Sequence, residues 1–526
     1  MMRSLKLLYP FLFVILPILN IMTGNPGGAT LSDVAGVLAA MLAGCAAVYA
    51  VVALATGARW ANPTVSLIVL ALVLWFYGYE WVRWVYRTSR DTPAPVVMTL
   101  VVVAVAAVAT VAGLRWVTRR PRHLDRATTF FALTGVLLVL WSGTRIISDQ
   151  LQARSDLRAS SLTRELSRPV PLQNTVTPAV GDSVRDIYLL ILDEYAHSRV
   201  LQERFEFDNR EMEDSLRQLG FTIPKLLRSN YVHTSLSLPS LLSFTHLTRL
   251  TGELGAGESD PTVPNRLVEN NRTLAFLKAR GYKVLFFPSQ WWISTEHNRN
   301  ADWEFQAWSG FRLGREIARS HLRRVFVDNT PLTVLRRDFA HDADHVKRTI
   351  AALKRVPGVS QPTFALAHLL NPHHPYVFDA KCRSMPKRPL GGWDQRRRDA
   401  YIDQVRCLNS LLLDFVTMVL QHSSASPIIL IVGDHGTSSL RYNKAKSAEA
   451  ITPAQARERL GTFGAFHLPG GGSRLFTDSV TLVNVLPKVL NHYFDAGIPL
   501  APDSLYLSLE QTPYLFVPVD PASLSQ

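Results

Sequence analysis

The stretch "IILIVGDHGTSS", residues 428–439, joins five consecutive aliphatic residues to a glycine, a carboxylate and an imidazole. Five aliphatic residues in a row predict a strand that is buried on both faces of a sheet. An acid and a histidine at the end of such a strand are costly unless hydrogen bonds or a metal ion satisfy them. Asp434 and His435 are therefore candidate ligands at the end of a central strand.

Further apolar strands alternate with helices on either side of this stretch. We expect strands over residues 187–194, 282–289, 363–370 and 427–435, and helices over residues 209–220, 271–281, 342–356 and 398–421. This alternation predicts an α/β domain with a mostly parallel sheet over residues 186–526.

Polar side chains follow three of these strands. Asp193 and Glu194 close the first, His368 precedes "LLNPHHPY" near the end of the third, and Asp434 and His435 close the fourth. In open α/β sheets, sites form beyond the carboxyl ends of the strands. Carboxylates combined with imidazoles, without thiolates, suit Zn²⁺ or Mn²⁺. The sequence thus predicts a divalent metal site at one edge of the sheet.

A nucleophile for such a site is offered by "SNYVHTSLSLPSLLS", residues 229–243, which is dense in hydroxyl groups. Ser and Thr are weak nucleophiles unless a base or a metal lowers their pKa. The alternative reading is helix capping, with Ser237 or Ser240 opening a helix beside Pro239. The two roles are compatible, because anions bind at helix amino termini.

The first 150 residues form a membrane domain by prediction. The chain has 526 residues, of which 47% are hydrophobic and 19% charged, with a mean hydropathy of +0.08. Five apolar runs approach the roughly 20 residues that cross a bilayer: 8–22, 34–56, 65–81, 96–114 and 130–147. The net charge is +14, and the sequence contains no nucleic-acid-binding motif. We therefore attribute the excess positive charge to loops that flank membrane spans.

Basic residues set the expected orientation. Arg3 and Lys6 precede the first run, and five arginines crowd the loop between the fourth and fifth runs, whereas residues 23–33 contain none. The positive-inside rule places the amino terminus in the cytoplasm, and five spans place everything after Ile147 outside it. The expected protein is a multi-pass protein of the cytoplasmic membrane.

Three smaller features accompany these domains. Residues 75–87, "WFYGYEWVRWVYR", indicate an interfacial aromatic belt or a docking surface for an anionic lipid headgroup. Residues 151–185 are expected to be a juxtamembrane helix followed by an extended linker. Cys382 and Cys407 could pair if their half of the chain faces an oxidising compartment.

Four segments in order, "LLILDEY", "SNYVHTSLSLPS", "HLLNPHHPY" and "IVGDHG", resemble the alkaline phosphatase and sulfatase superfamily. Five spans before such a domain resemble its membrane-anchored branch, the lipoteichoic acid synthases and the phosphoethanolamine transferases. The resemblance implies a metal-dependent phosphotransferase or phosphodiester hydrolase that acts on envelope lipid or polysaccharide. Its expected partners are a lipid-linked donor and an envelope glycan or lipid acceptor.

The resemblance also assigns roles to residues. It implies that Asp193, Asp434 and His435 bind one divalent metal, with Glu194 as the alternative to Asp193. Thr234, chosen over Ser235, would be the metal-bound nucleophile that carries the transferred group. The histidines that would contact the substrate or a second metal are His368 and His373, with His374 in reserve.

Two departures from the family pattern bear on function. Cys382 is followed by "RSMPK", which fails the C/S-x-P-x-R frame that formylglycine sulfatases need, so sulfate-ester hydrolysis is disfavoured. No histidine follows shortly after "DHG", and His467 comes late and is expected to end a strand. The alternative is therefore a non-catalytic envelope protein that uses a degenerate domain of this fold to bind glycan or an accessory partner.

Overall fold

The structure is a computed structural model that describes residues 2–23, 31–58, 62–89, 94–166, 185–289, 297–305, 325–327, 329–336, 342–385 and 392–524. Its contacts divide the chain into two units. The first contains Met1–Arg154 and Ser309–Phe339, and the second contains Ser155–Trp308 and Ala340–Gln526. Each unit is described by itself below.

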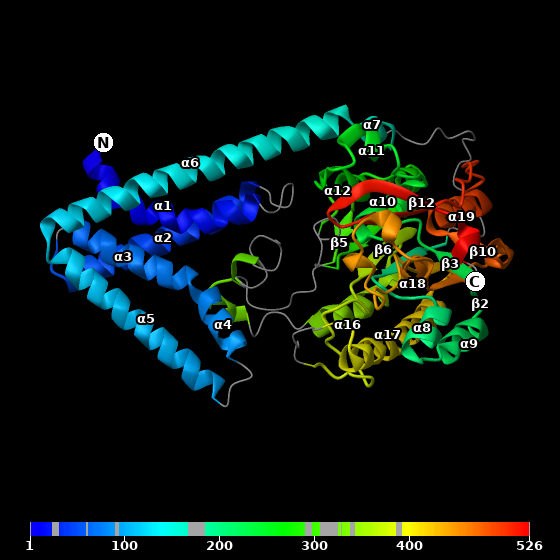
Figure 1. The fold of residues 1–526 in the computed structure, drawn as a ribbon. Coiled ribbons are helices and arrows are strands. Elements are labelled where there is room, and N and C mark those ends of the chain that lie inside the picture. Colours follow the sequence, from blue (N-terminus) through cyan, green and yellow to red (C-terminus); the bar gives the residue numbers. More distant parts are fainter. Residues whose placement is uncertain are drawn as a thin grey trace. The chain divides into compact units, whose positions relative to one another are not determined.

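The first unit is helical (Figure 1). Its helices are α1 (Met2–Thr23), α2 (Leu31–Ala55), α3 (Pro63–Tyr77), α4 (Tyr79–Thr88), α5 (Pro95–Thr118) and α6 (Pro121–Ala159). Three of them open on a proline, whose missing N–H costs nothing in the first turn. Asn62 caps α3 by accepting a hydrogen bond from the backbone N–H of Thr64 at 2.8 Å. The apolar runs predicted from the sequence are thus helices.

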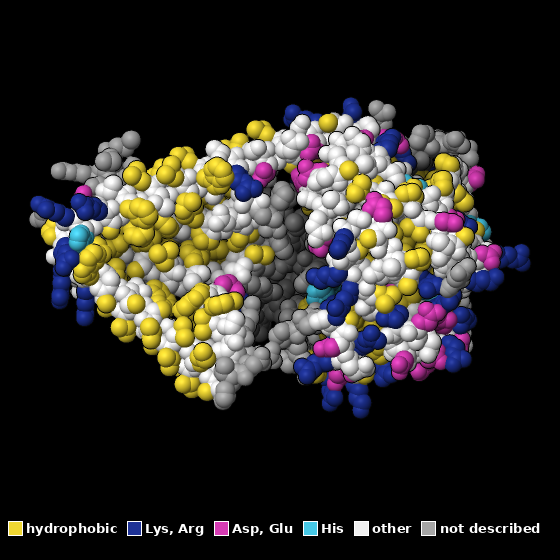
Figure 2. All heavy atoms as spheres, viewed as in Figure 1, with side chains coloured by type: hydrophobic (Ala, Val, Ile, Leu, Met, Phe, Trp, Pro, Cys, Tyr) yellow, Lys and Arg dark blue, Asp and Glu magenta, His cyan; other side chains and the backbone are white. Residues whose placement is uncertain are grey.

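Three of these helices, α2, α5 and α6, are long and apolar enough to cross a membrane. The third predicted run is instead a bent pair, because α3 and α4 meet at Gly78 with a 44° change of direction. The apolar part of α1, Leu8–Thr23, is shorter. Figure 2 shows hydrophobic side chains over the outer face of these helices and basic side chains at the α5–α6 turn. The count of five spans therefore stays a prediction.

The predicted juxtamembrane helix continues the last apolar run. Helix α6 extends without a break to Ala159, and the short helix α7 (Ser161–Leu166) follows at once. The carboxylate of Glu253 holds the start of α7, accepting hydrogen bonds from the Ser160 hydroxyl at 2.7 Å and the backbone N–H of Leu162 at 3.1 Å. The extended linker expected after α7 lies largely outside the described residues.

The second unit is built on a seven-stranded sheet with the order β2-β9-β7-β1-β6-β4-β5. Its strands are β1 (Ile187–Leu192), β2 (Phe221–Thr222), β4 (Lys283–Phe287), β5 (Trp303–Glu304), β6 (Thr363–Leu369), β7 (Ile428–Gly433) and β9 (Gly464–His467). The five strands from β7 to β5 pair in parallel, whereas β9 is antiparallel to both of its neighbours. The sheet is therefore mixed, with an antiparallel edge that was not predicted.

The central strand β1 packs against helices on both faces of the sheet. Tyr188, Leu190 and Leu192 belong to the core cluster that includes residues of α17 (Gln395–His422). The alternate residues from Ile187 to Ile191 belong to a second core cluster with α10 (Thr234–Ser243) and α13 (Arg272–Lys278). Side chains of a strand alternate between faces, so a strand covered on both sides must be apolar throughout.

Further helices and two small sheets surround this sheet. The helices are α8 (Ser198–Phe205), α9 (Arg210–Gln218), α11 (Leu250–Leu254), α12 (Thr262–Glu269), α16 (Asp342–Leu353), α18 (Pro453–Leu460) and α19 (Val485–Phe494). The small sheets have the orders β10-β3-β8 and β11-β12, and comprise β3 (Leu226–Arg228), β8 (Gly461–Thr462), β10 (Ser479–Thr481), β11 (Leu505–Leu509) and β12 (Thr512–Val519). The predicted helices and strands match those observed to within a few residues at each end.

Three local predictions have clear outcomes. The prediction that Ser237 or Ser240 opens a helix was wrong, because α10 begins at Thr234 and carries Pro239 inside it. His467 does end strand β9, and its Nδ1 bonds the backbone carbonyl of Pro427 at 2.8 Å. Cys382 and Cys407 form a disulfide, while Cys45 is a buried free thiol.

Candidate metal and nucleophile site

The site residues converge because three adjacent strands end at the same level. Leu192, the last residue of β1, is in register with Leu369 of β6 and with Gly433 of β7. Asp193 and Asp434 each take the next position along their strands. Their backbone N–H groups still bond across the sheet, to the carbonyls of Leu369 at 3.0 Å and Leu192 at 3.3 Å. Residues 241 positions apart thus come to one edge of the sheet.

Thr234 reaches this edge from the first position of α10. Its Oγ1 lies 3.0 Å from Nε2 of His435, and the hydroxyl is half-buried. Ser235 is also half-buried. Of the two hydroxyls considered from the sequence, the structure places Thr234 in hydrogen-bond contact with His435.

One cluster of possible ligands is formed by residues at the ends of β1, β6 and β7. Asp193, His368 and Asp434 offer ligand atoms that all lie within 4.8 Å of one another, and all three residues are buried. Nε2 of His435 is 3.3 Å from Oδ2 of Asp434 and 3.8 Å from Oδ1 of Asp193. The structure therefore brings together Asp193, Thr234, Asp434 and His435, and it adds His368 to them.

Glu194 belongs to a second cluster. Its carboxylate lies with the rings of His373 and His374, again with ligand atoms within 4.8 Å of one another. Glu194 has a backbone φ of 62°, a left-handed conformation that is uncommon for a residue with a side chain. This turn sends the side chains of two consecutive acidic residues into different clusters. Asp193 and Glu194 are thus placed in two sites instead of competing for one.

His435 is held in the tautomer that a metal ligand needs. Its Nδ1 lies 3.2 Å from the carbonyl oxygen of Gly436, which can only accept, so Nδ1 carries the proton. Nε2 then carries the single lone pair of the ring, which accepts a hydrogen bond from a guanidinium nitrogen of Arg459 at 3.0 Å. A ring N–H fixed by a backbone carbonyl is the usual arrangement around a metal-binding histidine.

Burial controls the ionisation of the site. It raises the pKa of Asp193 well above its ordinary range, and the nearby carboxylates of Asp434 and Glu194 raise it further. Burial also raises the pKa of Asp434 to about 6, although the Thr234 hydroxyl opposes the rise. The pKa of His368 falls to about 3 and that of His435 falls well below its usual range, mainly because both rings are buried. Both imidazoles are therefore neutral, as metal ligation requires.

Arg459, which was not predicted from the sequence, is the buried cation of the site. It lies on α18, and its Nε and Nη1 donate to the backbone carbonyls of Val232 and Gly436 at 2.8 and 2.7 Å. Its Nη1 also lies 3.4 Å from the Glu194 carboxylate. Burial alone would lower the pKa of Arg459, but Tyr442 and the acidic residues of the site raise it. In the sequence it is one of two arginines in "ARERLG", and nothing local marks it as the buried one.

The donor set fits a divalent metal ion. Among the described residues, Oδ1 of Asp193 and both ring nitrogens of His368 are buried without a hydrogen-bond partner. Buried polar atoms are almost always satisfied, so such atoms call for an explanation. Two buried carboxylates beside neutral imidazoles and one hydroxyl would supply oxygen and nitrogen ligands of the kind that Zn²⁺ and Mn²⁺ accept.

Comparison with known families places this site in a recognised domain. Residues 205–460 match the family model described as Sulfatase. The chain thus carries a sulfatase-like domain, and the resemblance to the alkaline phosphatase and sulfatase superfamily is confirmed. The matched segment includes Thr234, His368 and Asp434, while Asp193 precedes it. No curated protein matches the chain.

Several solved structures resemble this chain at low identity. The zinc complex of the C-terminal periplasmic domain of EcEptC from Escherichia coli is 12% identical and covers 65% of this chain and 94% of its own, with a TM-score of 0.42. The integral membrane phosphoethanolamine transferase EptA from Neisseria meningitidis is 12% identical, covers 93% and 95%, and has a TM-score of 0.40. The 2-O GAG sulfatase BT1596 is 15% identical and covers 63% and 74%, at 0.38. With TM-scores below 0.5, no function is carried over from these structures.

Proposed function

We propose that this chain is a membrane-anchored, metal-dependent phosphotransferase or phosphodiester hydrolase that works through a covalent intermediate on Thr234. The observation that carries the proposal is the contact of the Thr234 hydroxyl with Nε2 of His435, 3.0 Å apart. The same nitrogen lies 3.8 Å and 3.3 Å from the buried carboxylates of Asp193 and Asp434. This arrangement joins a hydroxyl to an imidazole and two buried carboxylates, which is the set of groups that a metal-bound nucleophile requires. The sulfatase-like domain supports the same class of chemistry.

Asp193, Asp434, His435 and the Thr234 hydroxyl would hold the metal, with His368 beside them. The ion would supply a Lewis acid that polarises a phosphoryl oxygen and lowers the pKa of the Thr234 hydroxyl. In the first half-reaction, the Thr234 oxygen bonds to phosphorus as the bond between phosphorus and the leaving alcohol breaks. In the second, an acceptor hydroxyl or water displaces Thr234 and takes the group.

Other residues prepare the site for this reaction. The amino-terminal turn of α10 places Thr234 where backbone N–H groups favour negative charge. Arg459 orients the His435 ring and provides a fixed positive charge close to the reacting oxygen. The second ligand cluster would contact the substrate or a second metal; it consists of Glu194, His373 and His374.

We further propose that the substrate is an envelope lipid or glycan and that the site lies outside the cytoplasm. The apolar helices of the first unit support attachment to the cytoplasmic membrane. The disulfide between Cys382 and Cys407 supports an oxidising compartment for the second unit. Attachment to the membrane would raise the effective concentration of a lipid-linked donor at the site.

The test compares Thr234→Ala with Ser235→Ala in the full chain, purified in detergent. The probe is bis(p-nitrophenyl) phosphate, and metal content is measured by elemental analysis. We expect Thr234→Ala to lose turnover while keeping most of its metal, because three protein ligands persist. Ser235→Ala should keep both. Peptide mass spectrometry of the acid-quenched wild type should show a p-nitrophenylphosphoryl adduct on Thr234.

Two results would overturn the proposal. Undiminished turnover in Thr234→Ala would remove the residue from the mechanism. Absence of tightly held zinc or manganese in the wild type, together with no turnover, would favour the glycan-binding alternative.

A further inference from the structure

The loop that follows β7 carries a hydroxyl to the second ligand cluster. Ser438 places its Oγ 3.5 Å from Oε1 of Glu194. Ser438 is half-buried, whereas Thr437 and Ser439 on either side of it are buried. A distance of 3.5 Å is at the outer limit of a hydrogen bond, and this is the one polar contact of the hydroxyl among the described residues. The Ser438 hydroxyl is therefore available to a ligand that enters the cluster.

Glu458 fixes the residues on both sides of Ser438. This carboxylate is buried on α18, and its Oε1 accepts hydrogen bonds from the Thr437 hydroxyl at 2.7 Å and the Ser439 backbone N–H at 2.6 Å. Its Oε2 accepts a hydrogen bond from the backbone N–H of Leu440 at 2.8 Å. A buried carboxylate is costly unless such donors satisfy it. Glu458 thus binds the neighbours of Ser438 and leaves the Ser438 hydroxyl to the second ligand cluster.

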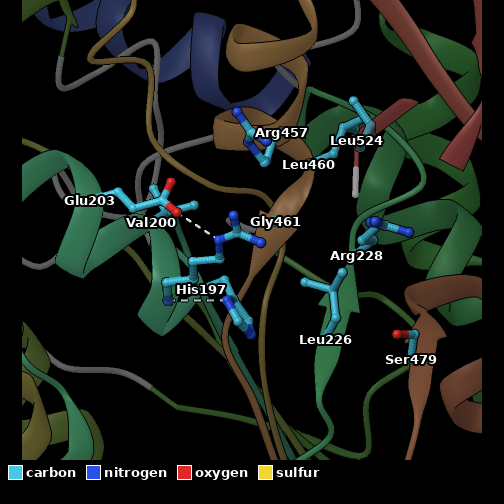
Figure 3. Close-up of a pocket in the computed structure, with 11 residues that line it drawn as sticks. His197, Val200, Glu203, Leu226, Arg228, Arg457, Leu460, Gly461, Ser479 and Leu524 are labelled. Carbon is cyan, nitrogen blue, oxygen red and sulfur yellow. Dashed lines mark hydrogen bonds and ion pairs between the residues drawn. The ribbon is translucent and has the colours of Figure 1, made fainter. Parts of the chain in front are cut away.

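Helix α18 holds the start of the same loop as well. The backbone N–H of Gly436 donates to the carbonyl of Arg459 at 2.7 Å, and the Arg459 guanidinium donates to the Gly436 carbonyl at 2.7 Å. A Cβ on Gly436 would lie 2.1 Å from the carbonyl oxygen of Glu458, so this close approach requires glycine. Arg457 and Leu460 of the same helix instead line a separate pocket of about 210 Å³ with α8, β3 and β10 (Figure 3). The loop is therefore bonded to α18 both before and after its half-buried hydroxyl.

A second donor approaches the same oxygen of Glu194. Nη1 of Arg459 lies 3.4 Å from Oε1 of Glu194, the atom that Ser438 contacts. The rings of His373 and His374 belong to the same cluster. A hydroxyl and a guanidinium close to one carboxylate oxygen are two donors that an anionic oxygen of a ligand could share.

We infer that Ser438 is a substrate-binding residue that donates a hydrogen bond to a non-bridging oxygen of the phosphodiester, and that Glu458 positions it. The inference rests on the proposed function, since it assigns a contact to the substrate of that reaction. A phosphoryl oxygen at normal hydrogen-bond distance is a better acceptor for this hydroxyl than a carboxylate 3.5 Å away. Ser438 would supply a polar contact from the segment after "DHG", which contains no histidine.

The first test measures kcat and KM for bis(p-nitrophenyl) phosphate with the zinc-loaded full chain in detergent. Ser438→Ala should raise KM about tenfold with little change in kcat, because the hydrogen bond is present in both the bound substrate and the transition state. Ser438→Thr keeps the hydroxyl and should recover most of the loss. The matched control is Ser439→Ala, which removes a hydroxyl that contacts Arg204 at 3.2 Å and keeps the backbone bond to Glu458. This control should behave as the wild type does.

Glu458→Gln tests the positioning role. The amide places an N–H group where one carboxylate oxygen accepted a hydrogen bond, so the loop loses a bond and KM should rise. In the Ser438→Ala background the same change should alter KM less than twofold, because the hydroxyl that Glu458 positions is absent. An equal rise in both backgrounds would overturn the role given to Glu458. Thermal melting of each variant guards against a folding defect, and Ser438→Ala decides if Glu458→Gln does not fold.

Binding of inorganic phosphate, measured by isothermal titration calorimetry, separates this inference from the proposed reaction. Ser438→Ala should weaken phosphate binding to the zinc-loaded chain about tenfold, a measurement that needs no turnover. If Thr234→Ala loses turnover while Ser438→Ala keeps the wild-type KM and phosphate affinity, the inference is overturned and the proposed function stands. If the wild type shows no turnover but its phosphate binding depends on Ser438, the proposed function fails and the binding residue stands.

Discussion

The hydroxyl of Thr234 lies 3.0 Å from Nε2 of His435, although 201 residues separate them in the chain. The contact joins the first turn of α10 to the loop that follows β7. Because the Nδ1 proton of His435 is held by the Gly436 carbonyl, Nε2 is the acceptor nitrogen, and it lies 3.0 Å from both the Thr234 hydroxyl and a guanidinium nitrogen of Arg459. The proposed nucleophile thus contacts a proposed metal ligand, and the predictions below concern the groups around this contact.

The metal-free protein should lose stability as pH rises. The folded-state pKa of Asp434 is raised from the ordinary 3.8 to about 6, so the folded state binds its proton more tightly than the unfolded state does. Protonation of Asp434 contributes about 3 kcal/mol to the free energy of unfolding. This contribution is fully present below pH 4 and is lost as pH rises through 6. Thermal melts of chelator-treated wild type between pH 4 and 8 measure this loss.

Asp434→Asn is the matched control for that pH dependence. It should flatten the curve and, without metal, melt at or above the wild-type temperature at pH 8, because it removes one of two repelling carboxylates. Added Zn²⁺ should then stabilise the wild type more than the variant. Equal pH dependence in both proteins would contradict the assignment of the raised pKa to Asp434.

Replacing the buried cation should destabilise the site. Arg459→Met leaves the Glu194 carboxylate and the carbonyls of Val232 and Gly436 without their donor, which should cost about 3–5 kcal/mol in unfolding free energy. Arg459→Lys should recover only part of this, since one ammonium cannot reproduce the forked contacts. Arg383→Gln, with a side chain that is 76% exposed, is the control and should melt as the wild type does.

The glycine before Asp434 should not tolerate a methyl group. A Cβ on Gly433 would lie 2.6 Å from the carbonyl oxygen of Tyr195 and would also overlap the Thr462 side chain. Gly433→Ala should therefore shift β7 and lower metal affinity together with stability. Gly257→Ala, where a Cβ meets nothing within 4 Å, provides the matched control. Metal titration and thermal melting of both variants check the prediction.

The disulfide offers a test of which compartment the second unit occupies. The chain has three cysteines, of which Cys45 alone is free. Denatured protein from cells should take up one maleimide–polyethylene glycol label without reductant and three after reduction, as read on a gel. Cys407→Ser should cost about 2–4 kcal/mol, because the bridge closes a loop of about 25 residues. Three labels without reductant would place the unit in a reducing compartment.

Local sequence patterns were sufficient to predict the central strands, the apolar helices and the meeting of polar residues at the strand ends. Five aliphatic residues before Gly433, and similar runs elsewhere, favour strands covered on both faces, so β7 and its neighbours β1 and β6 could be predicted. The long apolar runs indicated α2, α5 and α6 for a comparable reason, since a bilayer accepts about 20 apolar residues. Polar residues at the ends of parallel strands also predicted that Asp193, His368 and Asp434 would meet.

Other features depended on contacts between distant segments. Glu194 belongs to a different cluster from Asp193, and its backbone has a left-handed conformation. Arg457 and Arg459 both lie on α18, and it is Arg459 that contacts His435. The antiparallel partners β9 and β2 are too short to carry a periodic signal. Hydropathy and residue spacing predict which side chains of a segment are buried. Which segments contact one another depends on packing across the whole chain. The two ligand clusters depend on those contacts.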